Sequence, residues 1–371
     1  MSPSSIVPPS LHILGSGSIG LLFASSIRRA LPTYPVTVLL RSGRGHEDRI
    51  TRKTCPSGVE YSGITAQVKY PNDENSSFNV DVPAEIISPD PTDNAHETTT
   101  SIQNLLVATK APDAAAAVSS VLHRLEQNAN ANVIILSNGA MGVRDEIEEL
   151  LQREREGVDD QRSQFETRIT LASTTHGAYR LDNEGKVQND KRRPYSVVHA
   201  GIGSTFVESQ SMANLFDEAG LRATYASPDE MNILLWKKLA TNCAINPLTA
   251  LHKCVNGELA NMVVETRATM EGIIKEVSQI ARKDAADHGL SDDLIKELGY
   301  ESLLSFASNV IRGTASNKSS MLQDVLAERE TEINYLNGYV ARIGREKFGH
   351  ECPFNEEMVK RIEGLSALPV Q

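Results

Sequence analysis

The sequence is poor in cysteine, in basic charge and in long apolar runs. Its four cysteines form no CxxC pair and have no zinc-like spacing to the nine histidines: Cys55, Cys243, Cys254 and Cys352. We therefore expect reduced thiols, an intracellular protein and no metal site. Lysine and arginine total 37 against 48 acidic residues, a net charge of −11, which argues against nucleic acid as a partner.

Long apolar segments are also missing. No run of about 20 apolar residues occurs, and the first ten residues, MSPSSIVPPS, lack the apolar core of a signal peptide and the arginines of a transit peptide. We expect a cytoplasmic protein without membrane association. The length of 371 residues and the 40% hydrophobic content predict two domains with insertions, at roughly 150 residues per domain.

Strand and helix patterns alternate in the first half of the chain. Strand-like runs occur at 11–14, 36–40, 105–109, 132–137, 169–175 and 195–199, with helical patterns after the first run and at 113–126. This alternation predicts an α/β fold, a Rossmann-type doubly wound sheet over residues 1–207. From residue 208 onward the apolar residues recur at spacings of three and four residues, which predicts an all-α domain over 208–371. Within it we expect one long helix at 256–289 and another from about 319 past 335.

Two segments have the composition of insertions. Residues 71–101 are dense in Pro, Asn, Asp, Ser and Thr, and residues 152–168 are highly charged. We interpret the first as a long surface excursion and the second as a surface loop or helix end, and we expect no chemistry from either.

A glycine-rich turn, GSGSIG, follows the first strand and opens a helix. The first glycine permits a tight turn, the second lets the backbone approach a pyrophosphate, and the third allows close packing of helix on strand. Without this context the motif would indicate no more than a turn. Here the order of elements predicts a dinucleotide site formed by six residues: Gly15, Ser16, Gly17, Ser18, Ile19 and Gly20.

The end of the second strand indicates which dinucleotide is bound. An NAD enzyme usually has Asp or Glu about 20 residues beyond the glycines, whereas this sequence has Arg41 there. A guanidinium favours the 2′-phosphate of NADP. We therefore expect NADPH as cofactor, against the alternative of a solvated arginine at a strand end.

A polar stripe interrupts an apolar helical pattern in WKKLATNCAINPLTAL, which begins at Trp236. Lys238, Asn242 and Asn246 are four residues apart, so each is displaced by only about 40° around a helix. Burial without a ligand would cost several kcal/mol. The stripe therefore faces either solvent or a ligand.

The chain resembles the ketopantoate reductases (2-dehydropantoate 2-reductases) in six segments spread over nearly its whole length. They are ILGSGSIG, VATKA at 107–111, LSNG at 136–139, TTHGA at 174–178, the stretch from Trp236 through NGEL, and SSMLQDVLAERETEINYLNG at 319–338. The resemblance implies an NADPH-dependent reduction of 2-dehydropantoate to (R)-pantoate, on the route to pantothenate and coenzyme A. It also implies an active site in the cleft between a Rossmann domain and a helical domain.

Residue roles follow from the same resemblance. Lys238 would donate a proton to the carbonyl oxygen as hydride arrives, and Glu332 would orient the lysine or the substrate. Lys110 would contact the cofactor, and Asn138 would lie between cofactor and substrate. The remaining substrate contacts would be Asn242, Asn246, Asn256 and Ser320.

Several alternatives stay open at this point. His176 in TTHGA is interpreted as structural, because Lys238 already fills the acid's role. The expected substrate is a small 2-oxo acid, either 2-dehydropantoate or another branched one. The alternative from another class of protein is a non-catalytic sensor that binds NADP. The sequence is compatible with a homodimer and leaves the oligomeric state undetermined.

Overall fold

The computed structural model describes residues 9–43, 45–55, 58–71, 74–88, 100–125, 130–156, 167–181 and 194–366. The chain divides into two units, Met1–Ala226 and Ser227–Gln371. The sequence pattern predicts this boundary at 207/208. The structure has it later, because a short strand after residue 207 extends the sheet of the first unit and a helix packs against that strand.

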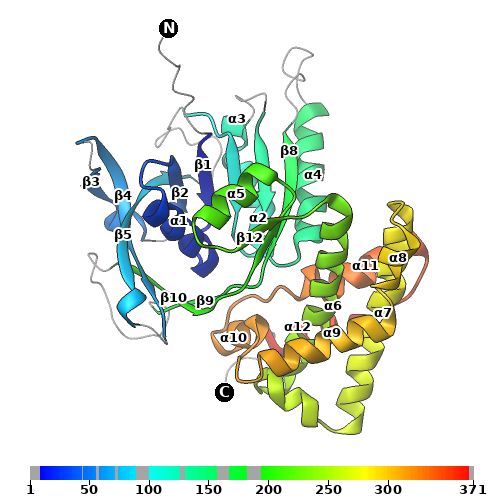
Figure 1. The fold of residues 1–371 in the computed structure, drawn as a ribbon. Coiled ribbons are helices and arrows are strands. Elements are labelled where there is room, and N and C mark those ends of the chain that lie inside the picture. Colours follow the sequence, from blue (N-terminus) through cyan, green and yellow to red (C-terminus); the bar gives the residue numbers. More distant parts are fainter. Residues whose placement is uncertain are drawn as a thin grey trace. The chain divides into compact units, whose positions relative to one another are not determined.

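Parallel strands form the centre of the first unit (Figure 1). Their order is β8-β7-β6-β1-β2-β5, and every neighbouring pair in this series is parallel. They are β1 (Leu11–Leu14), β2 (Val36–Arg41), β5 (Phe78–Ile87), β6 (Asn104–Val107), β7 (Asn132–Ile135) and β8 (Arg168–Thr174). Because both faces of β1 and β6 are covered, all their residues are buried. The predicted Rossmann-type sheet is confirmed.

Helices connect these strands. α1 (Ser18–Ala30) follows β1, α2 (Ala111–Ser119) and α3 (Leu122–Leu125) follow β6, and α4 (Ala140–Glu156) follows β7. α4 covers the start of the predicted insertion at 152–168, and most of the remainder of that segment lies outside the described residues.

The interpretation of 71–101 as a surface excursion is wrong for residues 78–87, which form β5. β5 pairs in parallel with β2 and antiparallel with β4 (Glu60–Lys69), which in turn pairs with β3 (Thr51–Thr54). Short 3-10 helices, η1 (Glu47–Arg49) and η2 (Glu74–Ser76), precede β3 and β5. A strand with an antiparallel neighbour needs apolar residues mainly on one face. The alternating polar residues of β5, within a polar segment, therefore gave no clear strand signal in the sequence. Residues 89–99 of this segment lie outside the described part.

A bent antiparallel ribbon joins the two ends of the sheet. β9 (Gly177–Arg180) pairs with β10 (Tyr195–Gly201), and β11 (Thr205–Val207) pairs with β8. At the bend, the backbone N–H of Thr175 donates to the Ser204 carbonyl at 2.9 Å. α5 (Gln210–Glu218) and β12 (Ala223–Tyr225) follow β11. β9 and β10 pass below α1 (Figure 1).

The core of the first unit lies around α1. Leu21, Leu22 and Phe23 are fully buried, and Phe23 meets Phe216 of α5 edge to face with ring centroids 5.2 Å apart. Strands and α5 therefore pack around α1. Because α1 begins at the glycine turn, this packing fixes the position of the turn.

The second unit is helical, as predicted. It consists of α6 (Pro228–His252), η4 (Asn256–Asn261), α7 (Val264–Asp287), α8 (Asp292–Lys296), α9 (Tyr300–Gly313), α10 (Ser320–Leu326), η5 (Ile333–Tyr335), α11 (Asn337–Phe348) and α12 (Pro353–Ser366). α6 begins with a capping box between Ser227 and Glu230.

Two predicted long helices are each interrupted. The predicted helix 256–289 consists of η4 and α7, because Met262 and Val263 between them are extended, with ψ of 159° and 160°. The predicted helix 319–335 ends with α10, because Glu328 has a φ of 54°, in the left-handed region. The local backbone conformation therefore overrides the helical composition at both points.

Candidate active site

The glycine turn between β1 and α1 has the geometry that an anion site needs. Gly15 has a φ of 114°, and a Cβ there would lie 2.8 Å from the backbone of Ala108. A Cβ on Gly20 would collide with the Gly15 carbonyl, whereas one on Gly17 would have its nearest neighbour at 3.9 Å. Gly15 and Gly20 are thus needed for the turn and the packing, and Gly17 leaves open space beside the helix start.

The first turn of α1 presents backbone donors. The N–H of Leu21 donates to the Gly17 carbonyl, so the N–H groups of Ser18 and Ile19 precede the first helical hydrogen bond. The turn holds no acidic side chain. Such a helix start favours a bound anion.

Three more predicted cofactor residues lie at the carboxyl ends of neighbouring strands. Arg41 ends β2, Lys110 follows β6 as the N-cap of α2, and Asn138 follows β7. Ser137 Oγ donates to the Thr109 carbonyl at 2.9 Å and so links the last two turns. The order β7-β6-β1-β2 brings these ends to one edge of the sheet, where open α/β sheets bind ligands.

Arg41 has a partner that the sequence did not indicate. Its Nη1 lies 3.3 Å from Oδ1 of Asp113 in the first turn of α2. Both side chains are partly exposed, so this pair contributes little to stability. It does hold the guanidinium at the end of β2.

Sequence reasoning also missed Arg180 at the end of β9. Its Nη1 donates to the carbonyl oxygen of Ser16 in the glycine turn at 2.6 Å. The two residues are 164 positions apart, and no motif spacing connects them. Pairing of β9 with β10 brings the arginine there.

His176 has the contacts of a structural histidine. Its Nδ1 lies 2.9 Å from Nε2 of His199, and its Nε2 lies 2.9 Å from the carbonyl oxygen of Leu221. Burial lowers the pKa of His176 below its ordinary value. Burial and the neighbouring His176 lower the pKa of His199 to about 4. Both rings are therefore neutral near pH 7, and they fasten the bend of the ribbon.

In the second unit, α6 carries Lys238, Asn242 and Asn246. Asn246 is buried, and the other two are half-buried. The adjacent Lys237 belongs to another face, where its Nζ lies 2.5 Å from Oε2 of Glu297. This separation agrees with the turn of about 100° between successive helical residues.

Lys238 has a perturbed pKa. Burial lowers it from 10.5 to about 8, and the negative charge of Glu332 acts in the opposite direction by raising it. Glu332 is itself only 7% exposed and lies directly before η5. The structure thus places the two predicted catalytic residues within electrostatic reach of each other.

Asn256, at the start of η4, keeps one buried polar atom available. Its Nδ2 donates to Oγ1 of Thr314 at 2.9 Å, while its Oδ1 is buried and has no hydrogen-bond partner among the described residues. An unsatisfied buried acceptor costs about 1–3 kcal/mol. A ligand that donates a hydrogen bond would remove that cost.

Ser320 is exposed at the start of α10, beside the buried N-cap Ser319. Oγ1 of Thr249, near the end of α6, donates to Oγ of Ser319 at 2.7 Å. This bond ties the start of α10 to the helix that carries the polar stripe.

Pro247 lies inside α6 without ending it. Proline cannot donate to the carbonyl four residues earlier, which is that of Cys243. Nδ2 of Asn337 supplies this hydrogen bond at 3.1 Å and also contacts Oδ1 of Asn355 at 2.9 Å. Asn355 in turn donates to Glu276 of α7. The buried amide network replaces the missing bond.

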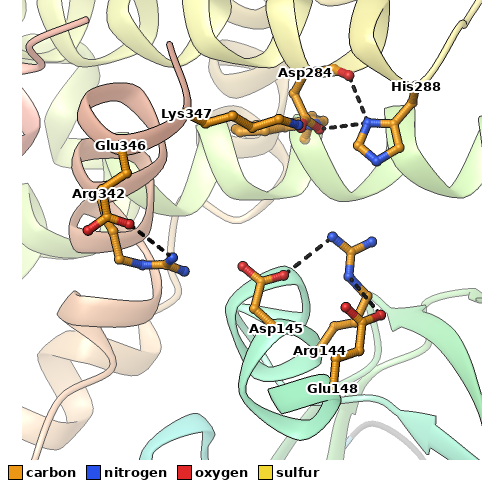
Figure 2. A network of polar contacts seen from close by, with 9 residues as sticks. Arg144, Asp145, Glu148, Asp284, His288, Arg342, Glu346 and Lys347 are labelled. Carbon is orange, nitrogen blue, oxygen red and sulfur yellow. Dashed lines mark hydrogen bonds and ion pairs between the residues drawn. The ribbon is translucent and has the colours of Figure 1, made fainter. Parts of the chain in front are cut away.

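A second anchor holds α6 just before Lys238. The indole Nε1 of the fully buried Trp236 donates to Oδ2 of Asp284 at 3.0 Å, and Lys347 contacts the other oxygen at 2.8 Å. Figure 2 shows Asp284 with Lys347 and His288, whose Nδ1 lies 2.8 Å from the Asp284 carbonyl. α6, α7 and α11 are thereby joined behind the polar stripe.

Within the described ranges, no group of three or more His, Cys, Asp or Glu side chains could hold a metal ion. None of the helices among the described residues is long and apolar enough to span a membrane. The four cysteines are free thiols.

Two family models match the chain over most of its length. Ketopantoate reductase PanE/ApbA matches residues 11–211, and Ketopantoate reductase PanE/ApbA C terminal matches residues 230–366.

Curated relatives agree with these models. A 2-dehydropantoate 2-reductase from Vibrio cholerae is 32% identical over 269 residues, 70% of this chain and 77% of the relative. A probable 2-dehydropantoate 2-reductase from Schizosaccharomyces pombe is 26% identical over 370 residues, 94% of both chains.

Solved structures share the fold. A PanE/ApbA family ketopantoate reductase from Ralstonia eutropha has a TM-score of 0.67 at 20% identity, covering 96% of this chain and 98% of the other. D-mandelate dehydrogenase with NADH and anilino(oxo)acetate has a TM-score of 0.68 at 18% identity, with the same coverage. The family models and the curated relatives establish that the chain belongs to the ketopantoate reductase family of oxidoreductases.

Proposed function

We propose that this protein reduces the ketone of 2-dehydropantoate to give (R)-pantoate, with NADPH as the reductant. The observation that carries the proposal is the half-buried Lys238, whose pKa is lowered to about 8, beside the buried Glu332 in the helical unit. The chain's family and the name of its Vibrio cholerae relative point to the same reaction.

The glycine turn fits the diphosphate of a dinucleotide. Gly17 leaves space beside the first turn of α1, and the N–H groups of Ser18 and Ile19 lie at the helix start. When bound, a reduced nicotinamide supplies the hydride. Arg41, at the end of β2, is the residue that we assign to the 2′-phosphate, which favours NADPH over NADH.

Lys238 would act as the general acid. Negative charge develops on the carbonyl oxygen during reduction, and a proton donor with a pKa near the working pH transfers its proton most effectively. Burial brings the lysine toward that range, and the carboxylate of Glu332 keeps it protonated. Glu332 would therefore hold the proton at Nζ and orient the reacting groups.

Three carboxamides and a hydroxyl would bind the substrate. Oδ1 of Asn256, the buried acceptor without a described partner, suits a hydroxyl donor of the substrate. The carboxamides of Asn242 and Asn246 and the hydroxyl of Ser320 can donate to a carboxylate. Fixed donors of this kind raise rate by orientation.

Another branched 2-oxo acid is the second candidate, because the same lysine, glutamate and asparagines would serve it. A non-catalytic sensor is less favoured, because the structure retains Lys238, Glu332 and the polar stripe together. The experiment is to follow NADPH and NADH oxidation by purified protein with 2-dehydropantoate and a panel of branched and aromatic 2-oxo acids. The highest kcat/KM is expected for NADPH with 2-dehydropantoate, and a larger value for another acid would reassign the substrate.

A further inference from the structure

The end of β9 places a guanidinium against the glycine turn. Nη1 of Arg180 donates to the carbonyl oxygen of Ser16 at 2.6 Å, and Ser16 lies between Gly15 and Gly17. β9, which passes below α1 (Figure 1), therefore ends beside the turn that precedes this helix. The positive charge of Arg180 therefore lies beside the glycine turn.

A second guanidinium lies on the same aromatic ring. The Cζ atoms of Arg180 and Arg49 lie 5.0 and 4.4 Å from the ring centroid of Tyr195. Tyr195 is 1% exposed, and its hydroxyl lies 2.7 Å from Nδ1 of His46. A ring held in this way fixes both arginines by cation–π contact and limits the entropy that they would lose on binding a ligand.

The position of Arg180 differs from that of Arg41. Arg41 ends β2 and is paired with Asp113, where the ribose of a dinucleotide would be recognised. Arg180 instead contacts the turn whose backbone holds the diphosphate in this class of site. Its guanidinium carries a full positive charge at the turn.

We propose that Arg180 is a cofactor-binding residue that contacts the diphosphate of the bound dinucleotide while it holds Ser16 in place. Arg49 adds a second positive charge next to the ring of Tyr195. This inference rests on the proposed function, because it requires a dinucleotide at the glycine turn. NADPH and NADH share the diphosphate that Arg180 would contact. The 2′-phosphate that we assign to Arg41 is present in NADPH alone.

Three substitutions separate charge from shape. Arg180→Gln keeps an N–H donor for the Ser16 carbonyl and removes the charge, Arg180→Lys keeps the charge, and Arg180→Met removes both. Arg52→Gln is the matched control, because Arg52 lies in the same unit with 89% of its side chain exposed. Thermal midpoints identify any variant that fails to fold.

Dissociation constants for NADPH and NADH are measured by fluorescence titration at low and high salt. Arg180→Gln is expected to weaken both cofactors by roughly 10-fold or more, the size of a charge-assisted contact. Arg180→Lys should recover part of the loss, and the difference from wild type should shrink at high salt. Arg52→Gln should match wild type.

Two results would overturn the inference. Wild-type affinity of a folded Arg180→Gln for both cofactors would show that the arginine only holds the turn. A loss confined to NADPH would show a contact with the 2′-phosphate instead. Failure of the proposed function is distinct from both results. A wild-type protein that binds neither cofactor has no dinucleotide site, and one that reduces another 2-oxo acid leaves the cofactor titrations of the Arg180 variants unaffected.

Discussion

At the scale of single residues, two adjacent lysines on α6 have opposite surroundings. Lys238 is half-buried near Glu332, whereas Lys237 forms an ion pair with Glu297. Lys238→Ala should lower kcat by about 10²- to 10⁴-fold, the usual contribution of a general acid, and leave the NADPH dissociation constant unchanged. Lys237→Ala is the matched control and should keep its turnover. Steady-state kinetics decide, and an inactive Lys237→Ala with an active Lys238→Ala would reverse the assignment.

Glu332 makes the pH dependence testable. In our proposal, reduction needs protonated Lys238, so its rate should fall as pH rises through about 8. The carboxylate of Glu332 raises the lysine pKa against the effect of burial. Glu332→Gln removes that charge and should move the basic limb of the pH–rate profile to lower pH. A limb that stays in place in this variant would show that another group controls it.

Arg41 and Asp113 determine cofactor preference in our proposal. Arg41→Ala should weaken NADPH binding by roughly 10- to 100-fold, as expected for loss of a charge-assisted contact, with NADH little affected. Asp113→Asn removes the carboxylate that lies 3.3 Å from the guanidinium and should tighten NADPH binding. Titration of both cofactors tests this pair, and equal losses for NADPH and NADH in Arg41→Ala would contradict it.

At the scale of elements, α6 depends on the side chain that replaces the hydrogen bond lost at Pro247. Nδ2 of Asn337 donates to the Cys243 carbonyl at 3.1 Å, and Asn337 is fully buried. Asn337→Ala leaves that carbonyl unsatisfied and should lower the free energy of unfolding by about 1–3 kcal/mol. Urea denaturation measures the change. The exposed Asn334→Ala is the control and should stay within about 0.5 kcal/mol of wild type, so equal effects in both variants would refute the role of Asn337.

At the scale of the whole molecule, buried histidines link stability to pH. Burial lowers the pKa of His12 and of His199 from 6.5 to about 4. Between these values the unfolded chain binds more protons than the folded one, so stability should fall as pH falls from 6.5 toward 4. Thermal midpoints across that window test this expectation. His199→Gln should flatten the dependence, and the exposed His123→Gln should leave it unchanged; identical slopes in all three proteins would contradict it.

Local patterns were sufficient to predict much of this molecule. The order of strand, glycine turn and helix identified the dinucleotide-binding half, and the spacing of Lys238, Asn242 and Asn246 identified a polar face on α6. Both signals are short-range, because strand and helix periodicities are properties of a few successive residues. The family motifs added Glu332, which no periodicity would have indicated.

Tertiary structure decided the features that depend on distant partners. β5 is a strand because it pairs with β2 and β4. The start of η4 is held by backbone hydrogen bonds to residues 315 and 317. The first unit extends to Ala226 because β12 pairs with β11 and α5 packs against both. The contact of Arg180 with Ser16, the pair of Arg41 with Asp113 and the replacement bond from Asn337 also join residues far apart in the chain. Composition reports what a residue can do, whereas pairing and burial in the folded chain determine which partner it meets.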